Sequence, residues 1–254
     1  MSTKINKLLT KWPKGAVGTS SWMEASGIGP DLRKAYKESG WIKAIASSAY
    51  TRFDDTADWQ GALFAMQTQL NLPIHAAALT AIELKGRAHF VPQGDKHRVY
   101  LFARRHATIP KWTNALPDAG RLHVVKTEIF GDMDDEGLSK FSCGNFSITI
   151  STLERAMMEF LYLVPKVHST DHARKIMESL TTLRPQVVQK LLENCKSVKI
   201  KRLFLALADE SDHRWVAQID KAKLNLGSGK RTIDPGGTYN AAYQITIAAR
   251  ELDQ

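Results

Sequence analysis

The chain opens on a short amphipathic pattern that stops at a proline. Apolar side chains recur three or four positions apart, which is the spacing of one face of an α-helix. These positions are Ile5, Leu8, Leu9 and Trp12, and Pro13 follows them directly. Because proline cannot continue a helix, the pattern predicts a first helix that ends before Pro13.

Two further short helices are predicted on either side of a glycine-containing turn. Ser21 and Glu24 have the spacing of a capping box, in which each side chain satisfies a free amide at a helix start. The second helix is expected to end at Gly27-Ile28-Gly29. Pro30 and Asp31 then open a third helix, because proline lacks the amide that would be unpaired there and aspartate complements the positive end of the helix dipole. Helix, glycine turn and helix together predict a helix-turn-helix.

A hairpin is predicted to follow the third helix. Residues 41–46 and 49–52 flank Ser47-Ser48 with the pattern of two short strands, which we interpret as the wing of a winged helix-turn-helix. An acidic stretch follows, and helices over residues 59–70 and about 76–85 are expected to complete or bridge this unit. The first domain is therefore predicted to span residues 1–86.

The remainder, residues 87–254, is predicted to form a larger mixed domain. Short strands separated by turns come first, and helices dominate afterwards; one of them opens at the capping-box spacing of Ser151 and Glu154 and stops at Pro165. The expected strands cover residues 98–103, 122–127, 146–150 and 243–248, and further helices cover residues 170–180, 185–194 and 198–208. The whole chain is thus expected to be α+β, with short strands and a bundle-like helical part in the C-terminal domain.

Composition agrees with a soluble, two-domain globular protein. The chain has 254 residues, 43% of them hydrophobic and 24% charged, and no apolar stretch is long enough for a bilayer span. Cys143 and Cys195 are too few for a disulfide framework and suit a reducing cytoplasm, where both are expected to be small buried side chains. The N-terminus lacks the unbroken apolar core of a signal peptide, so we expect a cytoplasmic protein.

Positive charge is concentrated at the N-terminus. The net charge is +9, and residues 1–52 hold nine Lys or Arg against three acids, a net +6. Such an imbalance favours a polyanionic partner. On the third helix, Arg33, Lys34 and Lys37 fall within one arc of about 100°, with Leu32, Ala35 and Tyr36 on the other side.

These features predict that the third helix enters the major groove of double-stranded DNA. Arg33 is suited to a two-pronged contact with guanine, and the lysines to phosphates or single acceptors. Thr19 and Ser20 are candidates for phosphate contacts, with simple helix capping as the alternative. The predicted DNA-binding residues are Thr19, Ser20, Arg33, Lys34, Lys37, Lys43, Ser47, Tyr50 and Arg52. The alternative is that these charges are solvated on an ordinary surface helix.

Several stretches in order along the chain carry a family resemblance. They are residues 8–15, 32–41, 59–63, 72–75, 80–84, 150–156, 161–165, 182–185 and 226–231. Together they resemble the AbiEi-type antitoxins of abortive-infection, type IV toxin–antitoxin systems. The resemblance implies a winged helix that represses its own operon at inverted repeats. It also implies a C-terminal domain that neutralises a co-encoded nucleotidyltransferase-like toxin without a stable protein complex.

Two positions depart from that family pattern. Relatives favour Gly-Arg-Gly at the wing tip, where this chain has Ala46-Ser47-Ser48, and Gly-Gly-Lys where it has Ala77-Ala78-Leu79. A wing arginine that enters the minor groove, and any role of that lysine, therefore do not transfer to this chain.

Candidate enzyme chemistry is weak throughout the sequence. Gly227-Ser228-Gly229-Lys230 lacks the first glycine of a phosphate loop, and Arg231 replaces the magnesium-binding Ser or Thr. Residues 132–137 begin like a calcium loop, but Cys143 stands where a bidentate Glu is needed. His168 and His172 lack a third zinc ligand and are expected to be exposed helix histidines. No enzyme activity, metal or cofactor is therefore expected.

A second basic concentration suggests an antitoxic surface. The run of residues 196–202 is predicted to be helical, and the candidate residues are Lys199, Lys201, Arg202, Lys230 and Arg231. A solvated helix face is the alternative. Two other functions stay open: direct gripping of the toxin, and a metal-dependent nucleotidyltransferase-like enzyme with a DNA-targeting domain, in which Asp132, Asp134 and Glu136 would act.

Overall fold

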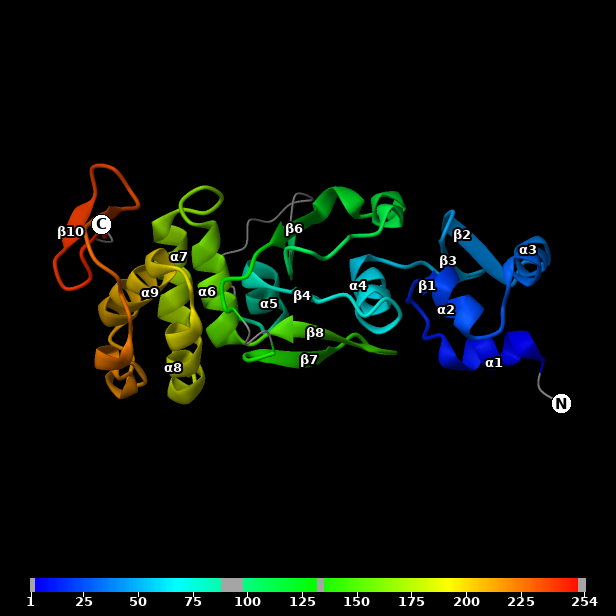
Figure 1. Ribbon diagram of the computed structural model, residues 1–254, viewed down its shortest axis with the longest axis horizontal. Helices are drawn as coiled ribbons and strands as arrows, with labels where there is room; N and C mark the ends of the chain where they lie inside the picture. The colour runs from blue at the N-terminus through cyan, green and yellow to red at the C-terminus, as the bar shows by residue number, and fades with distance from the viewer. Residues whose placement is uncertain (1–2, 88–97, 132–134, 251–254) are drawn as a thin grey trace. The chain divides into compact units, whose positions relative to one another are not determined.

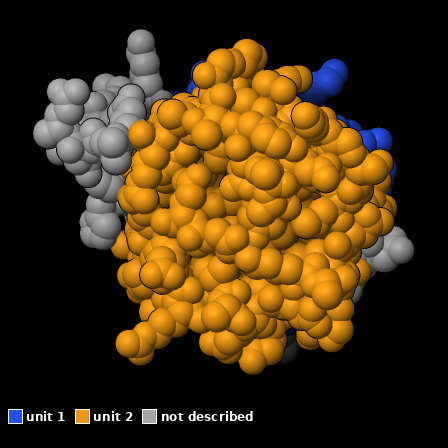
Figure 2. Space-filling model, turned by 90° about the vertical axis from the view of Figure 1, so that its left-hand side faces the viewer, with its two compact units in different colours: residues 1–76, 95–127, 140–150 blue, residues 77–94, 128–139, 151–254 orange. Residues whose placement is uncertain are grey.

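The computed structural model describes residues 3–87, 98–131 and 135–250, and it confirms a mixed α+β fold. The chain forms two compact units, distinguished by colour in Figure 2. Unit 1 comprises residues 1–76, 95–127 and 140–150, and unit 2 comprises residues 77–94, 128–139 and 151–254. The units are thus built from interleaved segments, and the consecutive domains 1–86 and 87–254 stay a prediction.

Unit 1 begins with the three helices and the hairpin expected from the sequence (Figure 1). The elements are α1 (Lys4–Lys11), β1 (Gly18–Thr19), α2 (Ser20–Ala25), α3 (Pro30–Glu38), β2 (Ile42–Ala46) and β3 (Ala49–Arg52). The three strands form an antiparallel sheet in the order β1-β3-β2. This order of elements is the one expected for a winged helix-turn-helix, in which β2 and β3 would form the wing.

The start of α2 differs from the prediction. Thr19, not Ser21, is the N-cap, and its Oγ1 accepts a hydrogen bond from the backbone N–H of Trp22 at 3.3 Å. The predicted capping box does not form, because the Glu24 carboxylate pairs with Arg33 instead.

One apolar cluster holds these elements together. The Trp12 side chain is 1% exposed and its Nε1 donates to the carbonyl of Ala16 at 2.8 Å. Gly18 lies against the same ring, where an added Cβ would sit 2.5 Å from a ring carbon, so only glycine is tolerated there. The other buried members of the cluster are Ile5, Leu8, Ala16, Met23, Ile28 and Ile42. Burial of these side chains fixes the angle between α1, α3 and the hairpin.

A five-stranded sheet, which lies mostly in unit 1, follows in the order β6-β5-β4-β8-β7. Helix α4 (Trp59–Thr68) precedes β4 (Ile74–Ala76), and the other strands are β5 (Val99–Ala103), β6 (Leu122–Lys126), β7 (Leu138–Ser142) and β8 (Ser147–Ser151). Short 3-10 turns, η1 (Lys111–Ala115) and η2 (Ala119–Arg121), connect β5 to β6. The prediction missed β4 and β7 and began a helix at Ala76, a residue that instead pairs with Leu101 on one side and Ile150 on the other.

Unit 2 is built around the buried helix α6 (Leu153–Leu163). Helices α5 (Ala78–Leu84), α7 (Thr170–Ser179), α8 (Pro185–Asn194) and α9 (Val198–Ser211) pack against it (Figure 1). Two 3-10 turns, η3 (Val216–Gln218) and η4 (Lys221–Lys223), lead to a small sheet of β9 (Arg231–Thr232), β10 (Thr238–Asn240) and β11 (Ile245–Ile247). The helices expected after residue 150 are confirmed. The strand expected at residues 243–248 corresponds to β11, whereas β9 and β10 were not predicted. No described helix combines the length and the apolar character needed to cross a membrane.

Candidate nucleic-acid interface

Helix α3 presents a polar face to solvent. Lys34 and Lys37 are exposed, and neither forms an ion pair with any residue that the structure describes. Leu32 and Tyr36, one turn apart, pack against the apolar cluster of the winged region. Ala35, expected on the packed side, is exposed instead. The helix therefore offers two free cations of the three expected.

Arg33 is the exception, and the prediction that it points outward is wrong. Its side chain is buried, with 9% of the residue exposed. Nη1 donates to the carbonyl of Ile28 at 3.0 Å and to that of Ser20 at 3.5 Å, and Nη2 pairs with the Glu24 carboxylate at 2.8 Å. Arg33 thus ties α3 to α2 and to the turn between them, and its guanidinium is held inside unit 1.

The wing keeps two exposed candidates. Lys43 on β2 and Ser47 in the hairpin turn are exposed. Tyr50 and Arg52 are half-buried; Tyr50 packs on the apolar cluster, and Arg52 donates to the carbonyl of Trp12 at 3.2 Å. Of these four wing residues, Lys43 and Ser47 are the ones fully available to a ligand.

Thr19 and Ser20 are occupied within unit 1. Thr19 is 2% exposed, and its backbone N–H donates to Gln69 Oε1 at 2.8 Å in addition to the cap that its hydroxyl provides. The backbone N–H of Ser20 donates to the carbonyl of Ser48 at 3.0 Å, which links α2 to the hairpin turn. The capping alternative is therefore correct for Thr19, whose hydroxyl is buried away from any phosphate.

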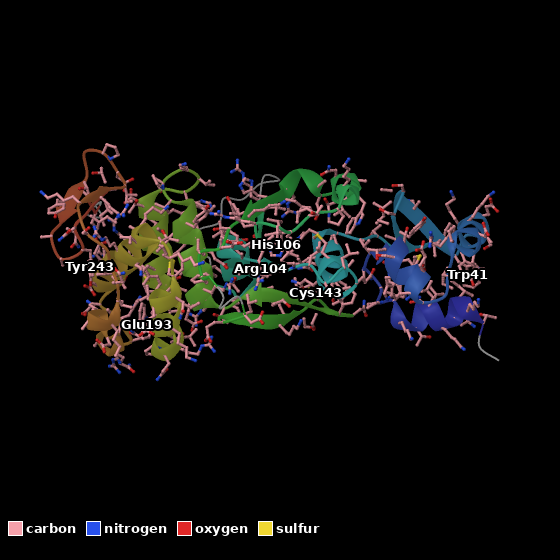
Figure 3. The ribbon with its side chains drawn as sticks, in the orientation of Figure 1. Trp41, Arg104, His106, Cys143, Glu193 and Tyr243 are labelled. Atoms are coloured by element: carbon pink, nitrogen blue, oxygen red, sulfur yellow. The ribbon has the colours of Figure 1, made fainter. Side chains whose placement is uncertain are left out.

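Two groups of exposed side chains lie outside the predicted DNA-binding set. Trp41 stands 46% exposed between α3 and β2 (Figure 3), and Phe53 is 63% exposed just after β3. Helix α1 packs its apolar positions inward and exposes Lys4, Lys7 and Lys11. The sequence signals for these groups are an aromatic residue at the start of the predicted hairpin, and lysines spaced three and four apart.

The basic run on α9 is buried, which contradicts its prediction as an antitoxic surface. Lys201 is 5% exposed and Arg202 is 2% exposed. Lys199 is half-buried, and its Nζ donates to the carbonyls of Tyr162 at 3.0 Å and of Val164. Burial, together with nearby Lys166, lowers the pKa of Lys199 to about 8. Lys201 and Arg202 are therefore packed inside unit 2, and Lys199 is held against the backbone of the same unit.

Lys230 and Arg231 are exposed, as the prediction requires. Lys230 Nζ lies 5.2 Å from the centroid of the Tyr239 ring. Of the five candidates for an antitoxic surface, these two can reach a partner.

The acidic turn, residues 132–137, is described in part. Asp132 and Asp134 lie outside the described residues. The Glu136 carbonyl accepts from Arg155 Nη1 at 2.8 Å, and its carboxylate lies 3.8 Å from Lys190 Nζ. Among described side chains, no group of three or more His, Cys, Asp or Glu is placed to hold a metal ion.

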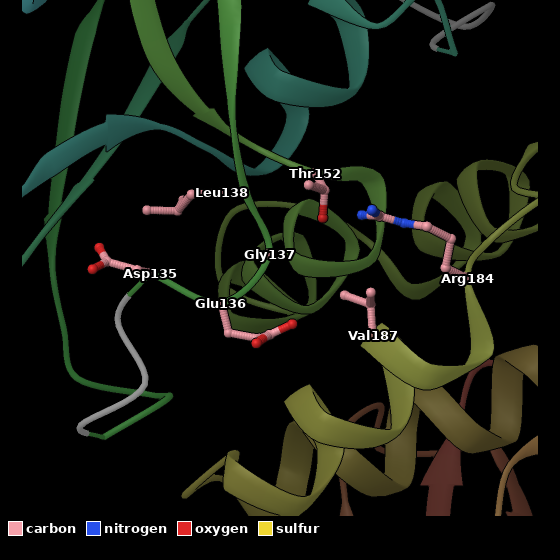
Figure 4. A pocket seen from close by; sticks show the side chains of 7 residues that line it. All are labelled: Asp135, Glu136, Gly137, Leu138, Thr152, Arg184 and Val187. Atoms are coloured by element: carbon pink, nitrogen blue, oxygen red, sulfur yellow. The ribbon is translucent and has the colours of Figure 1, made fainter.

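A cavity of about 340 Å³ adjoins this turn (Figure 4). Asp135, Glu136 and Arg184 line it, but the Arg184 guanidinium already makes two hydrogen bonds to Glu154, at 2.9 and 3.0 Å. Burial by itself raises the pKa of Glu154, yet the hydrogen bonds from Arg184 outweigh it and lower the pKa to about 2. The arginine is therefore neutralised by its partner, so the cavity has no free cation for an anion.

The histidines and cysteines have structural surroundings. His168 and His172 are half-buried, not exposed as predicted, because their rings pack on Phe160 with centroids 4.5 and 5.1 Å away. Cys195 is buried and Cys143 half-buried. Burial raises the pKa of both thiols, and nearby Asp58 adds to the effect at Cys143, so neither is an activated nucleophile.

Comparison with known proteins agrees with this geometry. Residues 1–93 match the family model "Transcriptional regulator, AbiEi antitoxin N-terminal domain", and residues 96–248 match "Transcriptional regulator, AbiEi antitoxin, Type IV TA system". A search of curated proteins gives no match. Among solved structures, the RV2827C protein from Mycobacterium tuberculosis has a similar fold, with a TM-score of 0.63 and 12% identity over 96% of this chain and 89% of that one. The chain belongs to the AbiEi family of antitoxins and transcriptional regulators of type IV toxin–antitoxin systems.

Proposed function

We propose that this protein represses its own operon by binding inverted repeats in the promoter. Helix α3 would lie in the major groove of double-stranded DNA, with the β2–β3 wing against the adjacent backbone. The observation that carries the proposal is the exposed face of α3, where Lys34 and Lys37 are free while the buried guanidinium of Arg33 holds the helix in place.

The cations of this surface suit phosphates and single base acceptors. Lysine is a point charge and cannot make the two-pronged contact with guanine that Arg33 was expected to supply. Sequence preference would then come from single lysine contacts and from DNA shape at the wing. Two inverted half-sites would be filled by two monomers or by one dimer.

Binding to a labelled duplex of the protein's own promoter tests the proposal. A variant with Lys34→Gln and Lys37→Gln should lose the preference for promoter over scrambled DNA. A control variant with Lys4→Gln and Lys7→Gln removes the same charge from the exposed face of α1. It should keep that preference, because it leaves α3 unchanged. Equal preference in both variants and the wild type would contradict the assignment of α3 as the recognition helix.

We further propose that the protein counteracts a co-encoded nucleotidyltransferase-like toxin in the bacterial cytoplasm, without a stable complex and without catalysis of its own. Lys230 and Arg231 are the exposed candidates for this role. Expression of the neighbouring gene by itself should arrest growth. Co-expression of this protein should restore growth, although the two proteins do not co-purify. Co-purification in a fixed ratio would instead indicate direct gripping of the toxin.

A further inference from the structure

A loop in unit 2 is folded around a buried arginine. Arg202 on α9 is 2% exposed, and its guanidinium donates to four backbone carbonyls. The acceptors are Leu226 at 2.8 Å, Gly227 at 3.1 Å, Gly229 at 2.6 Å and Gln244 at 3.1 Å. Three of them belong to the loop that precedes β9, so this loop turns its carbonyl groups inward onto one cation.

The same geometry turns amide groups outward. In a trans peptide, the carbonyl of one residue and the N–H of the next point in opposite directions. Because the carbonyls of Gly227 and Gly229 point at Arg202, the N–H groups of Ser228 and Lys230 point away from it. Within the described part of the chain neither N–H donates a hydrogen bond, whereas that of Arg231 donates to the carbonyl of Gln244 at 3.0 Å.

Glycine is needed for a backbone whose carbonyls point inward and whose N–H groups point outward. Gly227 has φ +64° and Gly229 has φ +76°, in the left-handed region that other residues rarely adopt. An added Cβ on Gly227 would also approach a Val198 methyl carbon to 3.0 Å. Backbone N–H groups that are turned away from the fold and left without an acceptor can bind an anion.

The same loop also carries exposed side-chain donors. The side chains of Ser228, Lys230 and Arg231 are exposed, and among described residues neither cation forms an ion pair. Asp234, the nearest acid along the chain, is occupied by the Thr170 hydroxyl at 2.6 Å and the backbone N–H of Ala248 at 2.9 Å. The loop is therefore positive and carries no competing carboxylate of its own.

We propose that this loop, residues 226–231, binds a phosphate group. Two amides, one hydroxyl, one ammonium and one guanidinium exceed what the two oxygens of a carboxylate can accept, whereas a phosphate offers several oxygens. Free nucleotides and nucleic acid backbones both present this group. Tyr239 on neighbouring β10, which lies at the left of Figure 1, is 42% exposed and provides an aromatic surface beside Lys230. The site is independent of the DNA contacts proposed for unit 1.

Amide NMR shifts of the full chain test this site. Inorganic phosphate, ATP and a short single-stranded oligonucleotide are titrated separately at constant ionic strength, and the signals of Ser228 and Lys230 are followed. Each phosphate species that binds should change the chemical shifts of these two amides, and the change should saturate as its concentration rises. Tighter binding of ATP than of the oligonucleotide identifies a nucleotide as the source of the phosphate, and the reverse order identifies a nucleic acid; either order supports the site.

Two double variants distinguish specific phosphate binding by the loop from non-specific attraction to positive charge. Lys230→Gln with Arg231→Gln should weaken phosphate binding by roughly tenfold or more, because two charge-assisted contacts are lost. Lys166→Gln with Arg214→Gln removes one exposed lysine and one exposed arginine elsewhere in unit 2 and should bind as the wild type does. Amides that do not move with any phosphate species, or equal weakening in both variants, would overturn the proposal, whatever unit 1 does with DNA.

Discussion

Replacement of Arg33 distinguishes a residue that positions the recognition helix from one that contacts DNA. Arg33→Met keeps the apolar stem and removes the guanidinium, which leaves the Ile28 carbonyl without its donor at 3.0 Å. An unsatisfied buried acceptor costs about 1–3 kcal/mol. The ion pair with Glu24 adds little, because the Glu24 side chain is 52% exposed and water replaces its partner. We expect a loss of about 2 kcal/mol in the free energy of unfolding, or roughly 4–8 °C in Tm.

The assay is thermal unfolding followed by circular dichroism, combined with DNA affinity measured well below the transition. Lys34→Met is the matched control, because Lys34 neighbours Arg33 on α3 but is exposed. Its unfolding free energy should stay within about 0.5 kcal/mol of the wild type. Folded Arg33→Met should still prefer promoter DNA. An unchanged Tm together with lost promoter preference would refute the positional role and make Arg33 a DNA contact.

Three further predictions follow from buried polar groups. Arg202→Met should lower the free energy of unfolding of unit 2 by roughly 3 kcal/mol or more, measured by denaturant unfolding, because four carbonyls lose a charged donor; a stable variant would contradict the account of the loop. Glu154 has a pKa of about 2 in the folded protein, below its ordinary 4.5, so its contribution is present above about pH 4.5 and is lost as pH falls toward 2. Glu154→Gln should make the free energy of unfolding less dependent on pH between about pH 4.5 and 2. An unchanged pH dependence in this variant would contradict the assigned ion pair with Arg184. Thr19→Ala should cost about 1 kcal/mol through loss of the α2 cap, with DNA affinity unchanged in a binding assay; reduced affinity of the folded variant would restore Thr19 as a contact.

The sequence predicted most helix boundaries because their signals are local. Proline or glycine next to an amphipathic run fixes the ends of α1, α3 and α8, and these ends depend little on the rest of the fold. Strand β4 was missed because it is three residues long, and both β4 and β7 are defined by their partners in the sheet. Ala76 became a strand residue through pairing on both sides, which no local pattern encodes.

The site residues were harder to predict, because a basic side chain was expected to lie at the surface, whereas Arg33 and Arg202 are buried against backbone carbonyls. Arg33 lies at the edge of the exposed arc of α3, and the Glu24 carboxylate with the Ile28 carbonyl draws it inward. Arg202 belongs to a basic run that suggests a solvated face, yet the carbonyls that bind it come from residues 226–244, far along the chain. Lys34 and Lys37 lie at the surface as predicted, and neither has a hydrogen-bond or ion-pair partner in the described part of the chain.

The dependence of DNA affinity on salt tests the central claim most directly, namely that Lys34 and Lys37 face the DNA. The slope of log affinity against log salt is measured on promoter duplex for the wild type, for Lys34→Gln with Lys37→Gln, and for Lys4→Gln with Lys7→Gln. Loss of the two lysines should reduce the slope in the α3 variant by about 1 for each lysine that neutralises a phosphate, and should lower promoter preference through each lysine that contacts a base. A wild-type slope and wild-type preference in the α3 variant would contradict the claim.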